Sequence, residues 1–168
     1  MTQPAVRLVD LVFGDIDLIA RWVGERHVSR WWGDPDEVFD ELETTFMSPG
    51  HAMIEAEGFK VGVVVYAHPT REELDTAGLH DISTECMDVD LFIGEPDALG
   101  RGFGREALRL AVERIFATTT APQIIAAMSA KNTVALETAQ KVGFDTSRRF
   151  TDPSGGAYVL CTIERPRS

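Results

Sequence analysis

The stretch Asp90-Leu-Phe-Ile-Gly-Glu-Pro-Asp-Ala-Leu-Gly-Arg-Gly-Phe-Gly-Arg105 decides the fold. A strand predicted over residues 87–93 leads into a glycine-rich turn, where a helix reaching to about residue 117 begins. Glycines let backbone N–H groups point outward at the positive end of a helix dipole, which creates an anion site. Arg101 and Arg105 add cations beside it. We therefore expect a phosphate or pyrophosphate there, although glycine spacing alone is equally typical of a tight loop.

Two other phosphate-binding motifs do not fit this turn. No Gly-Lys-Ser/Thr ends it, so it is not a Walker A loop. The preceding strand comes late in the chain and no first βαβ unit surrounds it, which makes it a poor dinucleotide fingerprint.

The rest of the chain alternates between apolar strands and amphipathic helices without a linker or an internal repeat. The predicted helices begin near residues 15, 34 and 133, and the predicted strands cover residues 5–9, 51–56, 60–67, 123–128, 146–150 and 157–163. Residues 68–85 are predicted as a long acidic loop with one helical turn at 71–74, and ordered loops of this length tend to be functional. The element order predicts an α/β (α+β) fold, a mixed sheet with helices on both faces.

Composition predicts one soluble domain over residues 1–168, because 168 residues with 44% hydrophobic and 26% charged side chains fit one core. No apolar run is long enough for a membrane span, and no signal-peptide pattern precedes the first strand. Two distant cysteines predict a reduced, cytoplasmic protein. The net charge of −11 disfavours nucleic-acid and anionic membrane partners and favours cations, although acidity can also serve solubility alone.

Two motifs resemble the GNAT superfamily of N-acetyltransferases. Leu99-Gly-Arg-Gly-Phe-Gly104 resembles its acetyl-CoA pyrophosphate loop, usually Gln/Arg-x-x-Gly-x-Gly/Ala. Asn132-Thr-Val-Ala-Leu-Glu-Thr-Ala-Gln-Lys-Val-Gly-Phe144 is similar to the signature Asn-x-x-Ala-x-x-x-Tyr-x-x-x-Gly-Phe at every named position but one. The resemblance implies a largely antiparallel mixed sheet with a splayed, bulged fourth strand. It also implies acetyl-CoA as co-substrate and no metal, and the four histidines show no metal-ligand spacing.

Within the superfamily, the chain is most similar to the aminoglycoside 6′-N-acetyltransferases. Trp31-Trp32-Gly33, the spacing from Val89-Asp90 to Leu99-Gly100, and the turn Thr151-Asp-Pro recur there. Siderophore-type acetyltransferases share part of the pattern. The resemblance implies acetyl transfer to the 6′-amine of aminoglycoside antibiotics, and hence antibiotic resistance. The alternatives are a GNAT enzyme for a siderophore hydroxylamine, a polyamine or a protein N-terminus, and a non-catalytic acyl-CoA-binding domain.

The predicted catalytic residue is Asp90, which matches the carboxylate that is base or amine ligand in the similar aminoglycoside enzymes. An alkyl amine is mostly protonated at neutral pH, since its pKa lies near that of lysine at about 10.4, so a base must take its proton. Asp88 and Asp90 share a face of an extended strand with Phe92. They could equally be ordinary exposed acids at the end of a strand.

The resemblance also implies the cofactor-binding residues. Backbone N–H groups of the bulged strand meet the acetyl and pantetheine groups, those of the glycine-rich turn bind the pyrophosphate, and Asn132 contacts the pantetheine arm unless it caps its helix. The first set is Leu91, Phe92 and Ile93, and the second is Gly100, Arg101, Gly102, Phe103, Gly104 and Arg105.

Ala139 departs from the family pattern, because alanine stands where the family commonly has a tyrosine general acid. Either the thiolate leaves with protonation by water or a nearby hydroxyl, or the protein is a weak enzyme or a CoA-binding module. A thiol is far more acidic than an alcohol, so the first alternative is favoured.

A polycationic acceptor needs several acids around its reacting amine. Trp32 and Tyr66 are candidate walls for sugar rings, although Trp32 could equally be a core aromatic. The candidate acids, which could also form a solvated face, are Asp34, Glu72, Glu85, Asp88 and Asp152. The expected partner is therefore a polycationic small-molecule amine, bound by a monomer or homodimer.

Overall fold

The computed structural model describes residues 4–46 and 48–168, which divide into two compact units. The first unit contains the described residues up to Val65 together with Leu91–Leu110. The second contains Tyr66–Asp90 and Ala111–Ser168. Strands β3 (Phe59–Ala67) and β4 (Met87–Ile93) and helix α5 (Phe103–Thr118) contribute residues to both units. The single domain expected from the sequence stays a prediction.

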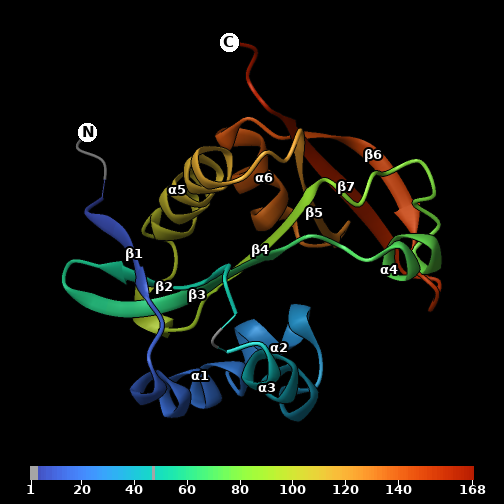
Figure 1. The fold of residues 1–168 in the computed structure, drawn as a ribbon. Helices are drawn as coiled ribbons and strands as arrows, with labels where there is room; N and C mark the ends of the chain where they lie inside the picture. The colour runs from blue at the N-terminus through green and yellow to red at the C-terminus, as the bar shows by residue number, and fades with distance from the viewer. Residues whose placement is uncertain (1–3, 47) are drawn as a thin grey trace. The chain divides into compact units, whose positions relative to one another are not determined.

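In the first unit, three helices accompany an antiparallel group of strands. Its strands follow the hydrogen-bonded order β1-β2-β3-β4, with antiparallel registers between β1 and β2 and between β2 and β3. Helices α1, α2 and α3 lie together beside these strands (Figure 1). The bounds are β1 Val6–Asp10, the 3-10 helix η1 Phe13–Asp15, α1 Ile16–Val23, α2 Arg26–Trp32, α3 Pro35–Thr44, β2 His51–Ala56, β3 Phe59–Ala67 and the 3-10 helix η2 Pro96–Ala98.

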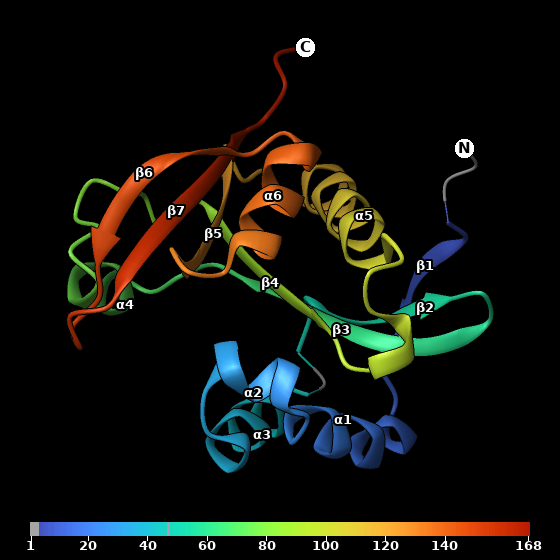
Figure 2. The same ribbon diagram turned by 180° about the vertical axis from the view of Figure 1, so that it is seen from behind.

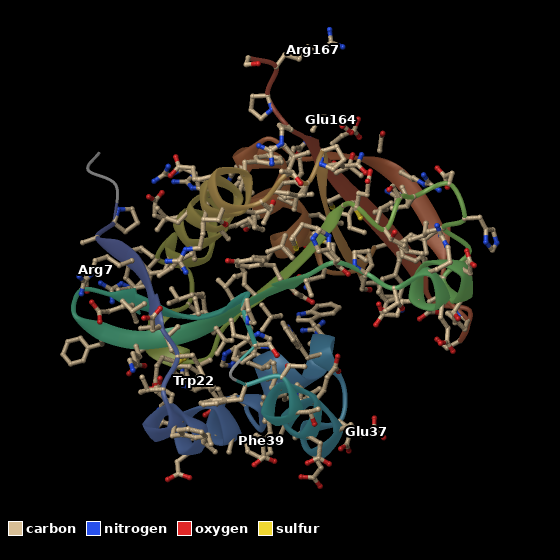
Figure 3. All side chains as sticks on the ribbon, in the orientation of Figure 1. Arg7, Trp22, Glu37, Phe39, Glu164 and Arg167 are labelled. Carbon is tan, nitrogen blue, oxygen red and sulfur yellow. The ribbon has the colours of Figure 1, made fainter. Side chains whose placement is uncertain are left out.

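The apolar stripes of these helices form the core of the first unit. Ile19, Trp22 and Val23 of α1 are buried, as the helical spacing predicts. Asp34 begins α3 by accepting hydrogen bonds from two backbone N–H groups, and Pro35 follows at the first helical position. In Figure 3, Trp22 lies on the side of α1 that faces the strands, whereas Glu37 of α3 points outward. The sequence did not predict α2, because Val28 is its one buried residue.

In the second unit, one parallel pair joins two antiparallel pairs in the strand order β4-β5-β7-β6. Strand β4 is parallel to β5 at Met87↔Ile124 and Asp88↔Ile125, while β5–β7 and β6–β7 are antiparallel. This register covers the start of β4. The predicted splay and bulge of β4 stay predictions. The bounds are α4 Arg71–Thr76, β5 Gln123–Ser129, α6 Thr133–Val142, β6 Asp145–Thr151 and β7 Ala157–Glu164.

The helical turn predicted at 71–74 within the loop 68–85 is present as the slightly longer helix α4, and the segment packs on its own apolar cluster. Thr70 and Glu73 form a capping box at the start of α4. Helix α4 lies near one end of β6 and β7 in both ribbon views (Figures 1 and 2). The cluster beneath it consists of Leu74, Leu79, Ile82, Cys86, Ile125 and Leu160. Tertiary packing therefore orders a segment that lacks a clear periodicity.

Candidate active site

The last three residues of β4 are held by helices on both faces of the strand. The buried Phe92 ring packs edge-on against Trp22, with ring centroids 6.3 Å apart, and against Trp32 at 5.0 Å. On the opposite face, a Cβ placed on Gly104 of α5 would lie 3.7 Å from Ile93 Cγ1. Helices on both faces are thus confirmed here, and the backbone of residues 91–93 is firmly placed.

The turn after β4 is fixed by contacts that sequence reasoning missed. A Cβ on Gly94 would lie within 2.6 Å of Trp22 Cβ and closer still to its indole ring, so only a glycine fits. Trp22 Nε1 donates to Glu95 Oε1 at 2.9 Å, and Glu95 also pairs with Arg21. His27 Nε2 lies 2.9 Å from the Ile93 carbonyl oxygen, so the ring donates through Nε2. No local sequence signal reveals these contacts, since α1 and Glu95 are more than 70 residues apart.

The glycine-rich turn has the backbone conformation that an anion site requires. Gly100 and Gly102 have φ angles of 71° and 81°, the left-handed region that favours glycine, and the space beside each is open. The Gly102 carbonyl accepts from the Glu106 N–H at 3.2 Å, so the N–H groups of residues 103–105 start the helix without helical partners. These residues fit a diphosphate group. A bound acetyl-CoA would supply the activated thioester.

The two arginines and Phe103 of this turn differ in what they can contribute. Arg101 pairs with Glu57 at 2.8 Å, and its guanidinium lies 4.7 Å from the centre of the Phe103 ring. The Phe103 side chain is buried, so only its backbone can meet a ligand. Arg105 is exposed. We therefore expect Arg105 rather than Arg101 to supply the more available positive charge.

In the second unit, β4 carries an acid that titrates near neutral pH. Burial, and then the charge of Glu73, raise the pKa of Asp88 from 3.8 to about 7. Solvent nevertheless reaches Asp88, as it does Asp90 two residues later. A carboxylate with a pKa close to the operating pH is suited to accept a proton. From its sequence position, Asp88 was expected only to bind substrate. Its raised pKa could not be predicted, because desolvation depends on neighbours that are distant in the chain.

We expect Asp88→Asn to stabilise the protein as pH rises. A raised folded-state pKa means that the folded protein binds the proton more tightly, so stability is lost as pH rises from about 3.8 towards 7. The variant removes this loss; because solvent reaches the side chain, we expect a gain of only about 1 kcal/mol at pH 8. Urea unfolding at pH 5 and pH 8 measures it, with Asp97→Asn as an exposed control. Equal pH dependence in both variants would contradict the expectation.

Several predicted site residues are already engaged in local structure. Asn132 Oδ1 accepts from the Ala135 N–H at 3.2 Å and caps α6, and Asp34 caps α3. Asp152 accepts from the Gly156 N–H and the Ser154 hydroxyl, bonds that lower its pKa. Trp32 packs against the core of the first unit. The binding roles of these residues stay predictions, as do those of the exposed Glu72 and Glu85 and the partly buried Tyr66.

Ala139, at the position of the usual tyrosine, is fully buried in α6. A tyrosine introduced there would have to displace packed atoms, and overpacking of this kind typically costs 1–3 kcal/mol, roughly. Ala139→Tyr would therefore perturb folding as well as supply a hydroxyl, and a rate measured on it would not isolate the missing general acid.

Among residues 4–46 and 48–168, no three histidine, cysteine, aspartate or glutamate side chains gather into a potential metal site. Over the same residues, each helix is too short or too polar to cross a membrane.

Residues 13–151 match a family of proteins described as an acetyltransferase (GNAT) domain. Because this match spans most of the chain, the protein belongs to the GNAT acetyltransferases. Both the glycine-rich turn that opens α5 and the helix that Asn132 begins lie within the matched region.

Among its relatives are two aminoglycoside N(6′)-acetyltransferases type 1. The Klebsiella pneumoniae protein is 26% identical over 174 residues, with 92% of this chain and 83% of that protein covered. The Serratia marcescens protein is 25% identical over 162 residues, with 87% and 77% covered.

Solved structures confirm the predicted fold class. The crystal structure of aminoglycoside acetyltransferase AAC(6′)-Ib in complex with coenzyme A has a TM-score of 0.76 at 20% identity, covering 96% of this chain and 95% of that one. The complex of the same enzyme with coenzyme A and kanamycin has a TM-score of 0.76 at 19% identity, with the same coverage. The chain thus has the mixed α/β GNAT fold.

Proposed function

We propose that this GNAT acetyltransferase uses acetyl-CoA to acetylate a primary amine of a polycationic small molecule, the 6′-amine of an aminoglycoside. The observation that carries the proposal is the composition of the acidic segment. We define this segment as His68–Asp90, which ends within β4, directly before Leu91. This segment holds seven aspartates and glutamates and a single arginine. Such a surface attracts polyammonium compounds, and similar proteins are aminoglycoside N(6′)-acetyltransferases.

The donor half of the reaction rests on backbone N–H groups. Those at the start of α5 would hold the diphosphate of acetyl-CoA, with the exposed Arg105 beside them. Those of residues 91–93 would bind the thioester oxygen, which becomes negatively charged when the amine attacks. Donors fixed in advance cost no reorganisation during the reaction, and the contacts of Phe92, Gly94 and Glu95 fix this backbone.

The acceptor half needs a neutral amine. Asp90 directly precedes Leu91 in β4, and we assign it as the group that takes the ammonium proton, directly or through water. The amine then attacks the carbonyl carbon, the C–S bond breaks, and coenzyme A leaves as a thiolate. The nitrogen, which carries a positive charge after the attack, loses its second proton to water. Since a thiol is acidic, with a pKa of about 8.5 for cysteine, water can in turn protonate the thiolate without a residue at position 139.

The proposal includes a reducing compartment, the cytoplasm. Both cysteines are free and buried, and burial raises the pKa of Cys86 and of Cys161 to about 11. These thiols are therefore packing groups, and no described disulfide contributes to stability.

A screen of amine acceptors tests the proposal. We expect CoA release with acetyl-CoA and kanamycin-type substrates, and an acetyl group on the 6′-nitrogen by mass spectrometry and NMR. Resistance of cells that express the gene would follow. If polyamines, hydroxylamines or peptide N-termini are acetylated and aminoglycosides are not, the acceptor is one of those other amines. If CoA binds tightly and no amine is acetylated, the chain is a binding domain.

A further inference from the structure

We propose that Arg71 is a positioning residue for acceptor binding, and that the Asp81–Arg148 ion pair supports it. Together they hold the acidic segment in the conformation in which its carboxylates bind a polyammonium molecule. The inference rests on the proposed polycationic acceptor. All of the contacts that carry it lie within the second unit.

The Arg71 guanidinium ties α4 to the stretch of chain that follows the helix. Its Nε donates to Asp75 Oδ1 at 3.0 Å, its Nη1 to the Ile82 carbonyl at 2.9 Å, and its Nη2 to the Leu79 carbonyl at 3.2 Å. One planar fork thus satisfies a carboxylate on its own helix and two backbone carbonyls. A lysine ammonium is a compact point charge and cannot span three acceptors placed in this way.

A second link joins the acidic segment to β6. Arg148 donates from Nη1 and Nη2 to the two carboxylate oxygens of Asp81, each at 2.7 Å. This bidentate pairing lowers the pKa of Asp81 to about 2, so the pair stays charged across the physiological range. His80 lies 3.0 Å from Asp75, and the apolar cluster of Leu74 and Leu79 lies beneath.

These links keep like charges close together. Glu73 accepts from the Thr70 N–H at 2.7 Å, which fixes its carboxylate at the start of α4. From there its charge acts on Asp88 at the start of β4. His68 bonds the Cys86 carbonyl at 2.9 Å and holds the two ends of this arrangement together. Carboxylates that repel each other in a fixed frame gain most when a ligand supplies ammonium groups.

The sign of the Arg71 effect separates positioning from simple electrostatics. Arg71 is the only lysine or arginine in the acidic segment. If long-range charge alone governed acceptor binding, removing it would make the segment more negative and tighten the binding of a polycation. If Arg71 positions the segment, removing it weakens binding, because the carboxylates lose their fixed arrangement.

The test measures the binding of kanamycin and of spermine by calorimetry, in parallel with acetyl-CoA. We expect Arg71→Lys and Arg71→Gln each to weaken polycation binding about ten-fold, which is about 1.4 kcal/mol, and to leave acetyl-CoA binding unchanged. Arg149→Gln, an exposed change next to Arg148 in β6, is the charge-matched control and should bind the polycations as tightly as the wild type. Unchanged or tighter polycation binding in both Arg71 variants overturns the inference.

A charge swap keeps the test decisive if the Arg71 variants do not fold. Arg148→Asp alone should weaken polycation binding, and Arg148→Asp with Asp81→Arg should restore most of it, because the ion pair is re-formed with reversed polarity. Failure of the double variant to recover would overturn the role of this pair. A wild-type protein that binds kanamycin but transfers no acetyl group refutes the proposed function and leaves the inference standing. Absence of binding to both polycations refutes the inference itself.

Discussion

Asp90→Asn is expected to lower the rate of acetyl transfer by roughly a hundred- to ten-thousand-fold at neutral pH, the range typical for loss of a positioned base. The asparagine side chain keeps the size of aspartate but cannot accept a proton from the ammonium group. Binding of acetyl-CoA should stay within about two-fold of the wild-type value, since the diphosphate is assigned to the backbone of residues 100–105. Steady-state kinetics with an aminoglycoside and calorimetry with acetyl-CoA measure the two effects separately.

The neighbouring acid makes this experiment selective. Asp88, with its pKa raised to about 7, is the other carboxylate of β4 suited to proton transfer. If Asp90 is the base, Asp88→Asn raises KM for the polycation and leaves kcat largely intact. If instead kcat falls sharply in Asp88→Asn while Asp90→Asn remains active, Asp88 rather than Asp90 is the base. The control Asp97→Asn removes an exposed charge in η2 and should change neither constant by more than about two-fold.

The secondary structure could be predicted where local patterns agree with packing. Strand β4 has the predicted bounds and helix α6 begins where predicted, because the apolar run of the strand and the capping asparagine of the helix are local signals. Helix α2 could not be predicted, since most of its residues are outside the core. Helix α4 extends beyond the predicted turn, to Thr76, and its Leu74 belongs to an apolar cluster that includes the distant Leu160, which no periodicity encodes.

The features of the candidate site likewise fall into those that local motifs predict and those that depend on tertiary structure. The conformations of Gly100 and Gly102 follow from the glycine motif, so the sequence predicts the anion site. The pairing of Arg101 with Glu57 could not be predicted, because the two residues are 44 positions apart. The raised pKa of Asp88 likewise depends on how the chain surrounds it. Local motifs thus indicate the chemistry, whereas the availability of each charge is decided by tertiary structure.

Gly94→Ala is expected to destabilise the fold strongly, because the added methyl group has no space. Its Cβ would lie within 2.6 Å of Trp22 Cβ and closer to the indole ring, and Trp22 is completely buried. Either the indole moves out of the core or the turn after β4 shifts, and we expect a loss of about 3 kcal/mol, at the upper end for overpacking. Urea unfolding measures the loss, with Gly14→Ala as control because no atom lies within 4 Å of its Cβ.

The same change should weaken acetyl-CoA binding even at a temperature where the variant is folded. Gly94 N–H donates to the Val61 carbonyl at 2.7 Å and its neighbour Glu95 accepts from Trp22, so a shift of this turn moves the backbone on both sides of it. A second variant, Trp22→Leu with Gly94→Ala, removes the clash but leaves Glu95 without the indole donor. The loss of stability in this double variant should be smaller than the sum of the losses in Gly94→Ala and Trp22→Leu by about 1 kcal/mol or more, as coupling between contacting residues predicts. Strict additivity, or a Gly94→Ala variant as stable as Gly14→Ala, would show that the turn has room and that Trp22 does not position it.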